Sequence, residues 1–235
     1  MLTDNVTFLR LAGLLAIAGA LAYAVGDVFL LAGQANLADY PRLQPHAKLL
    51  SDAEKMVALP WWRLAWGGLL GVFATPLVLA GFWSVYQGLM PAGTAQALPP
   101  YVLFACATIV ATIVGAFVHG SFIYLGEYVQ ALNTVSDDSQ PVIAGMLARH
   151  RRILIITYGF LLLCILVASV WFAVVVASGR TRFPRWMAFA NPIVTFIAWM
   201  LVKRLLPRRL SQHTEGAGFN IAYLAFFALT TAALW

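Results

Sequence analysis

The most regular feature of the sequence is a succession of long apolar runs separated by short polar stretches. Each run is close to, or longer than, the ~20 residues that an α-helix needs to cross the hydrocarbon core of a bilayer. Because lipid offers no hydrogen-bond partners, a spanning segment must satisfy its own backbone groups, and each run is expected to be helical. The sequence therefore predicts six transmembrane helices, at about residues 7–33, 61–89, 101–132, 152–178, 184–206 and 217–235.

The composition agrees with an all-α polytopic membrane protein that forms a single transmembrane domain over residues 1–235. Of the residues, 62% are hydrophobic and only 10% are charged, whereas a soluble domain is about 25% charged. The first run is interpreted as a retained span rather than a signal peptide, because its apolar stretch continues past the small residues near Ala24.

The basic residues lie almost entirely between the apolar runs, which is typical of topology signals rather than of a nucleic-acid surface. Four of the 15 Lys and Arg residues fall on the side of the N-terminus: Arg10, Arg180, Arg182 and Arg185. The others fall on the opposite side: Arg42, Lys48, Lys55, Arg63, Arg149, Arg151, Arg152, Lys203, Arg204, Arg208 and Arg209. The positive-inside rule makes that second side cytoplasmic. We therefore expect a plasma (inner) membrane protein with both termini outside.

The first long loop, residues 34–60, contains a second amphipathic pattern. Apolar residues recur at helical spacing with charged residues between them: Leu49, Leu50, Ala53, Met56 and Val57. This pattern predicts a short amphipathic helix at about 47–58. Such a helix either lies on the membrane surface or packs on its own bundle.

Two segments of the chain resemble each other. The sequence FATPLV at 73–78 is followed by Trp83, and FANPIV at 189–194 is followed by Trp199 at the same offset. The two predicted spans would run in opposite directions, which is the relation expected of a 3+3 inverted repeat. In that arrangement Pro76 and Pro192 mark paired kinks.

Ionisable residues inside predicted spans cost ~2.5–3.5 kcal/mol each on insertion scales and therefore tend to face the bundle interior. Three of them stand out as candidates. They are Asp27, His119 and Glu127. Two carboxylates in a low dielectric cannot both ionise at low cost, so one would keep its proton beside His119. These three residues are the candidate catalytic acids and bases, and Arg63 could instead neutralise one carboxylate.

Further polar residues are predicted at the same depth as candidate ligand-binding groups: Tyr23, Arg63, Tyr124, Tyr158, Asn220 and Tyr223. At 100° per residue, His119, Gly120, Tyr124 and Glu127 share one broad stripe. A structural reading stays open for each ionisable residue. A 32-residue helix is ~48 Å long and exceeds the ~30 Å core, so Glu127 would emerge among the headgroups. His119 would then only hydrogen-bond neighbouring helices.

No motif indicates a cofactor or a metal. His46, His150 and His213 lie in loops, so His119 lacks the second deep histidine that a bis-His haem needs.

Three functions remain. The first is binding or chemical modification of an apolar or amphipathic small molecule by acid/base chemistry. The second is a proton- or ion-coupled transporter, and the third is a non-catalytic membrane subunit. Polar groups that gather in one leaflet favour the first. The expected partners are membrane lipids and such a molecule, not nucleic acid.

Overall fold

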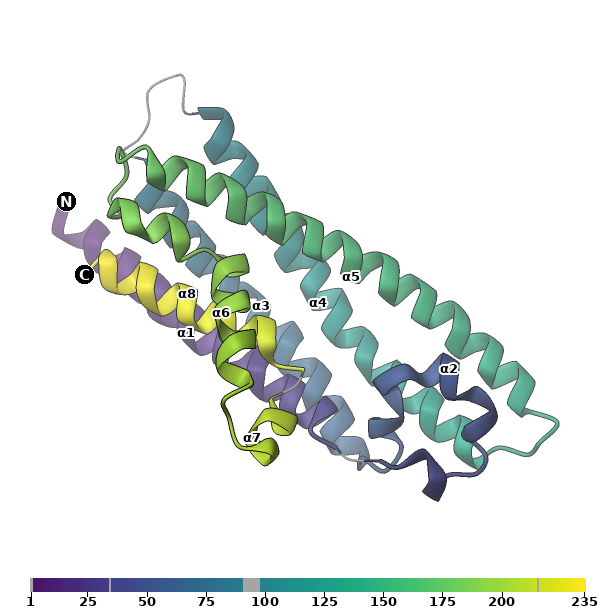
Figure 1. Cartoon of the computed structure of the whole chain (residues 1–235). Coiled ribbons are helices and arrows are strands. Elements are labelled where there is room, and N and C mark those ends of the chain that lie inside the picture. Colours follow the sequence, from purple (N-terminus) through teal and green to yellow (C-terminus); the bar gives the residue numbers. More distant parts are fainter. Residues whose placement is uncertain (1, 34, 91–97, 215) are drawn as a thin grey trace.

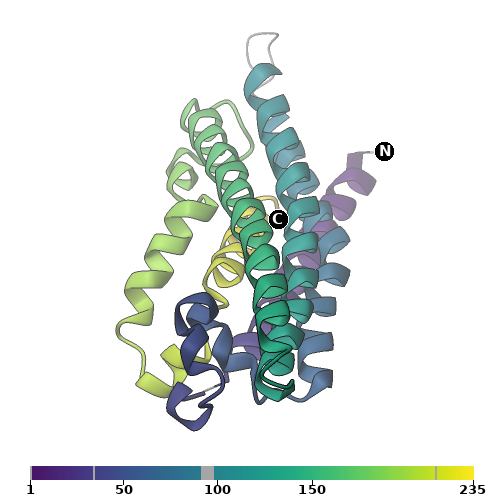
Figure 2. The same cartoon turned by 90° about the vertical axis from the view of Figure 1, so that its right-hand side faces the viewer.

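The computed structural model describes residues 2–33, 35–90, 98–214 and 216–235, and every regular element within them is a helix. Four long helices lie side by side along the bundle (Figures 1 and 2). They are α1 (Leu2–Leu31), α3 (Trp61–Leu89), α4 (Leu98–Thr134) and α5 (Gln140–Ala177). All four are long and apolar enough to cross a membrane. The prediction of a helical membrane protein is confirmed to this extent.

The last two apolar runs form shorter helices. Helix α6 (Pro192–Lys203) has 12 residues and α8 (Gly218–Ala233) has 16. At 1.5 Å per residue they are about 18 and 24 Å long, less than the ~30 Å hydrocarbon core. Neither is counted among the helices that can cross a membrane alone, and the six complete spans predicted from the sequence are not confirmed.

The fifth run breaks at Asn191. A short 3-10 helix, η5 (Arg185–Phe189), precedes it. The Asn191 side chain donates to the carbonyl of Ala188 at 2.9 Å and accepts from the amide of Val194 at 3.1 Å, so it caps α6. Pro192 takes the first helical position, where its missing N–H costs nothing. Pro76 instead lies inside the continuous helix α3, so the paired kinks of the predicted repeat are not found.

Residues 35–60 pack on the bundle as a series of short turns. These are η1 (Leu37–Asp39), η2 (Gln44–His46), α2 (Ala47–Leu50) and η3 (Ser51–Met56). Ser51 has a φ of +50°, which interrupts the single helix predicted at 47–58. Gln34, at the start of the predicted loop, lies outside the described residues.

The buried side chains of this segment decide between the two placements left open by the sequence. Leu43, Leu50 and Met56 are fully buried and share a cluster with Leu132 of α4 and Leu147 of α5. The Gln130 amide of α4 also donates to the carbonyls of Met56 and Leu59 at 3.1 and 2.7 Å. The segment therefore packs on its own bundle rather than lying free on a membrane surface.

The two ends of the bundle differ. We call the end that carries residues 35–60 the loop-one end, and the opposite end, where both chain termini lie, the termini end (Figure 1). At the termini end the guanidinium of Arg10 lies over the ring of Trp235, 4.9 Å from its centroid. The helical hairpin of α4 and α5 reaches the loop-one end, where Arg42 bonds Asp137 at 2.7 Å.

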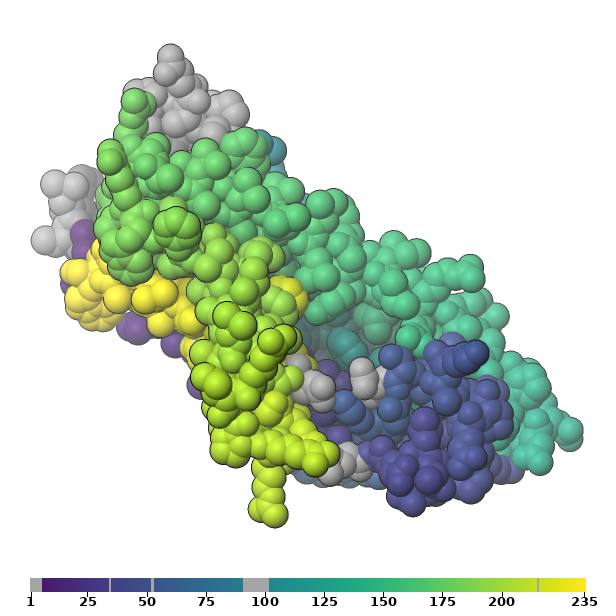
Figure 3. All heavy atoms as spheres, in the orientation of Figure 1, coloured from purple at the N-terminus to yellow at the C-terminus, as the bar shows by residue number. Residues whose placement is uncertain are grey.

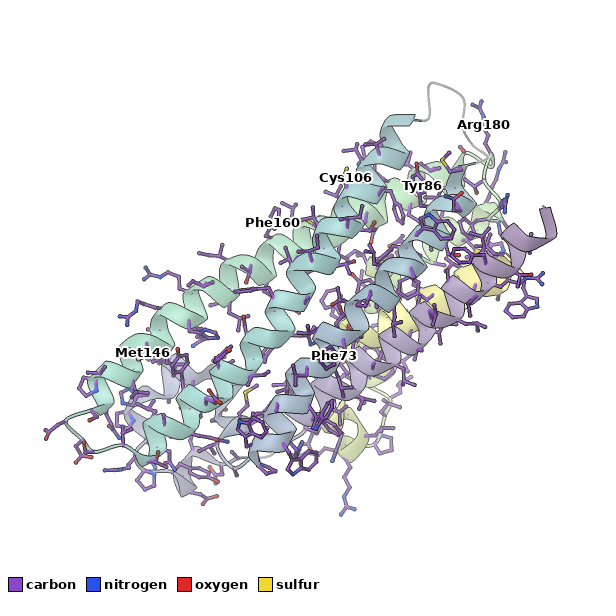
Figure 4. All side chains as sticks on the ribbon, turned by 180° about the vertical axis from the view of Figure 1, so that it is seen from behind. Phe73, Tyr86, Cys106, Met146, Phe160 and Arg180 are labelled. Atoms are coloured by element: carbon purple, nitrogen blue, oxygen red, sulfur yellow. The ribbon has the colours of Figure 1, made fainter. Side chains whose placement is uncertain are left out.

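The outer surface between the two ends is apolar. Phe73, Cys106 and Phe160 all lie on it (Figure 4). The interior near the termini end is rich in phenylalanine, with Phe82, Phe104, Phe172, Phe226 and Phe227 buried against one another. Apolar residues thus occupy both the outside and the core, as expected of a protein whose solvent is lipid.

Candidate functional site

A cavity of about 740 Å³ lies among α1, α3, α4, α5, α6 and α8. This volume is within the range of sites for small molecules and cofactors. Most of its wall is apolar, with side chains such as Val78, Phe82, Leu162 and Ile165. Polar groups interrupt this wall where α1, α4 and α8 meet.

The polar part of the wall is built around Asp27, which is buried on α1. Its Oδ2 accepts a hydrogen bond of 2.6 Å from the side-chain amide of Asn220 on α8. Its Oδ1 lies 3.7 Å from Nδ1 of His119 on α4. Three helices that are far apart in the sequence therefore supply the cluster Asp27–His119–Asn220.

The imidazole of His119 is held from two sides. The ring of Tyr23, on α1, stacks on it with centroids 4.5 Å apart and an interplanar angle of 30°. On α3, Gly71 faces the ring so closely that an added Cβ would overlap its Cγ. Tyr23 is itself fixed by a 2.9 Å hydrogen bond between its hydroxyl and that of Thr75. The position of the ring is thus determined by packing.

The cluster retains unused hydrogen-bonding capacity. Nδ1 of His119 is buried without a hydrogen bond, because 3.7 Å to the carboxylate exceeds the 2.7–3.2 Å of a normal N–H···O bond. The hydroxyl-bearing rings of Tyr23, Tyr158 and Tyr223 line the same cavity. A carboxylate, an imidazole and phenols in a mostly apolar cavity can donate protons to, or accept them from, a polar group placed among them.

The cavity opens sideways between α5 and α6. Ile155 and Tyr158 of α5 and Met200 of α6 line it and are also exposed on the molecular surface. Figure 3 shows a hollow between the yellow-green surface of α6 and α7 (Arg208–His213) and the green surface of α5. The opening faces in a direction perpendicular to the long helices, toward the space that lipid would fill.

Six of the nine residues predicted for the site line this cavity: Tyr23, Asp27, His119, Tyr158, Asn220 and Tyr223. The structure places the other three outside the cavity wall. Glu127 and Tyr124 are exposed on α4. Arg63 donates to the carbonyl of Val28 at 3.2 Å and is not part of the cavity wall.

The error for Glu127 and Tyr124 has a simple geometric cause. Glu127 is eight residues from His119, which at 100° per residue turns it by about 80°, and Tyr124 is turned by about 140°. Both fall on the outward stripe of α4 that also exposes Ile113 and Phe117. The stripe of residues predicted from the sequence to face inward was therefore broader than the face of α4 that packs against the bundle.

The sequence reasoning also missed residues that shape the site. Lys203 lines the cavity but was counted only as a topology signal. The sequence pattern that could have revealed this role is the spacing of Phe196, Met200 and Lys203, which places them on one face of α6. Gly68 and Gly71 of α3 and Gly126 of α4, rather than Gly120 of α4, lie at the close approach of these two helices.

Among the residues that the structure describes, no three His, Cys, Asp or Glu side chains gather closely enough to hold a metal ion. A family model described as "Family of unknown function (DUF6796)" matches residues 4–234. The chain belongs to this family. The matched region contains every residue of the cavity wall. No curated protein and no solved structure matches the chain.

Proposed function

We propose that this member of the DUF6796 family binds an apolar or amphipathic small molecule in its intramembrane cavity and acts on it by acid/base chemistry. The observation that supports the proposal is the Asp27–His119–Asn220 cluster in the wall of a cavity that opens sideways. In this proposal His119 exchanges a proton with the bound molecule, and Asp27 orients and stabilises the imidazole.

The state of the cluster favours a site over a purely structural contact. Buried polar groups in proteins are nearly always hydrogen-bonded, so an exception calls for an explanation. Here Nδ1 of His119 is buried and lacks a bond, although Asp27 is only 3.7 Å away. Polar residues that serve only to join helices would be expected to satisfy one another. A polar group of a ligand would supply the missing partner.

The direction of the opening favours a ligand that partitions into lipid. A molecule that passes between α5 and α6 meets the exposed side chains of Ile155 and Met200 before it reaches His119. The ligand can still carry a polar head or a polar end group, because Tyr158 and Asn220 line the same cavity. It does disfavour a strongly hydrated ion as the substrate, because an ion loses its hydration on this path.

A proton- or ion-coupled transporter is less well supported. Transport requires polar groups that continue toward the second face of the membrane. The interior on the side of the termini end is instead rich in buried phenylalanines such as Phe104, Phe172 and Phe226, and among the described residues no charged side chain is buried there. The paired proline kinks that would have favoured a transporter repeat are not found.

Blocking the opening tests the proposal. Gly159 of α5 lines the cavity, and a Cβ added there meets no atom within 4 Å. We expect Gly159→Trp to fold normally and to fill the opening. After purification in lipid nanodiscs, solvent extraction and mass spectrometry should show a small molecule that is enriched in the wild type. In the variant it should be depleted by about tenfold or more, equivalent to at least ~1.4 kcal/mol of binding free energy.

Gly145→Trp is the matched control. Gly145 is on the same helix but outside the cavity, and its nearest neighbour would be the flexible end of Arg149 at 3.7 Å. We expect this variant to retain the wild-type set of extracted molecules. Identical extracts from the wild type and both variants would contradict the proposal and support a non-catalytic membrane subunit.

We also propose that the loop-one end is cytoplasmic, in the plasma (inner) membrane, with both termini outside. The excess of Lys and Arg at the loop-one end supports this orientation. A periplasmic reporter such as alkaline phosphatase is expected to be active when it is fused at the C-terminus and inactive when it is inserted between Asp137 and Asp138. The reverse pattern would contradict the orientation without affecting the site.

A further inference from the structure

We infer that the cavity takes an amphiphile with a single anionic group, whose head pairs with Lys203 and whose apolar tail extends toward Phe82. The inference rests on the proposed function and names the class of ligand for the same site. It is carried by the gradient of polarity along the cavity and by the state of the Lys203 ammonium.

The cavity changes from charged to apolar along the bundle axis. On α6, the wall runs from Phe196 through Met200 to Lys203, the last residue of the helix at the loop-one end. On α3, by contrast, the wall consists of Val78 and Phe82, which lie toward the termini end. A molecule aligned with this gradient has its polar group at Lys203 and its hydrocarbon near Phe82.

Lys203 has no counter-charge of its own. Its ammonium makes no ion pair with any residue in the described part of the chain, and its side chain is half-buried. Placing an ammonium beside apolar side chains costs free energy unless an anion compensates it. Three arginines follow Lys203 closely in the sequence and make the local potential more positive: Arg204, Arg208 and Arg209. An anionic head would therefore gain both pairing and long-range attraction at this end.

The region around Asp27 limits the ligand to one anionic group. The Asp27 carboxyl is already bonded to Asn220 and lies deeper along α1 than Leu31, the residue of α1 at the loop-one end of the cavity. A second anion beside it would be buried without a cation to compensate it, which costs free energy. The favoured ligand is thus charged at the Lys203 end only, with a neutral region beside Asp27 and His119.

Three ligands with the same hydrocarbon chain separate the effect of head charge. We would measure binding of radiolabelled oleate, oleyl alcohol and oleylamine to the full chain in phosphatidylcholine nanodiscs, with binding to empty nanodiscs subtracted. Oleate is expected to bind about tenfold more tightly than the alcohol, and the amine most weakly. Lys203→Gln should remove the preference for oleate over the alcohol. Arg204→Gln, which changes a neighbouring cation outside the cavity wall, should retain most of the preference.

The outcomes distinguish this inference from the proposed function. If the three ligands bind equally and Gly159→Trp blocks all of them, the inference of an anionic head group is contradicted, while the proposal of a binding cavity is supported. If Gly159→Trp changes none of the binding, the proposed function itself fails. If inorganic phosphate displaces oleate at the same concentration, the site recognises a free anion, and the inference that the ligand is an amphiphile is contradicted. Loss of the oleate preference in Lys203→Gln, without displacement by phosphate, supports the inference.

Discussion

Asp27→Asn is expected to lower binding of the native ligand by about tenfold or more while the thermal unfolding midpoint stays near that of the wild type. The substitution keeps the shape of the side chain, and the new amide oxygen can still accept the hydrogen bond from Asn220, which is 2.6 Å long in the wild type. What it removes is the ionisable carboxyl group, whose Oδ1 faces Nδ1 of His119 at 3.7 Å. Ligand extraction followed by mass spectrometry, together with a thermal unfolding curve, would measure the two effects separately.

Two companion variants make this test decisive. Asp39→Asn makes the same chemical change at an exposed residue of η1 and should alter neither property. Asp27→Ala should lower the stability as well, because the amide of Asn220 is left buried without its partner, at a cost of ~1–3 kcal/mol. If Asp27→Asn binds the native ligand as the wild type does, the carboxylate serves only to join α1 and α8.

Gly71→Ala is expected to reduce both stability and ligand binding. The added Cβ would overlap the ring of His119, and the ring cannot move freely because Tyr23 stacks on its other side. Overpacking of this kind costs about 1–3 kcal/mol, so the unfolding midpoint should fall. The displaced imidazole should also lose its position relative to Asp27, and binding should decline together with stability.

Gly120→Ala provides the same substitution on the facing helix. There the added Cβ meets Val72 at 3.6 Å, an ordinary contact. Alanine favours a helix over glycine by up to ~1 kcal/mol, so this variant should be as stable as the wild type or slightly more so. Equal behaviour of the two variants would mean that α3 and α4 do not approach as closely as the structure indicates.

The paired variants also separate the two roles of the cluster. Asp27 and Asn220 tie α1 to α8, whereas Tyr23 and Gly71 hold His119 of α4 between α1 and α3. The first tie is a hydrogen bond and the second is a steric fit. A loss of binding without a loss of stability therefore points to the carboxyl group of Asp27, and a loss of both points to the placement of the ring.

The sequence by itself determined the class of the protein and the core of the candidate site. The backbone of a long apolar run in lipid can be satisfied only by a helix, so the sequence predicted a helical membrane protein. Four of the six predicted spans form helices long and apolar enough to cross a membrane. Asp27 and His119 stood out because ionisable residues at such depth are costly and are therefore turned inward. Both line the cavity, together with Asn220.

The tertiary structure decided whatever depends on which face of a helix meets its neighbours. The stripe on α4 was too broad to separate His119 from Glu127, and only the packing against α3 shows that Glu127 faces outward. The sequence predicted a kink at Pro192. In the structure the Asn191 side chain instead caps a new helix that begins at Pro192.

The cavity itself was not readable from any single segment. Lys203 looked like a topology signal because its role depends on α1, α4, α5 and α8 standing opposite the face of α6 on which it lies. Hydrophobic periodicity reports how each helix is oriented toward an average environment. It does not report which helices leave a space between them, because that space is set by the shapes of side chains far apart in the sequence.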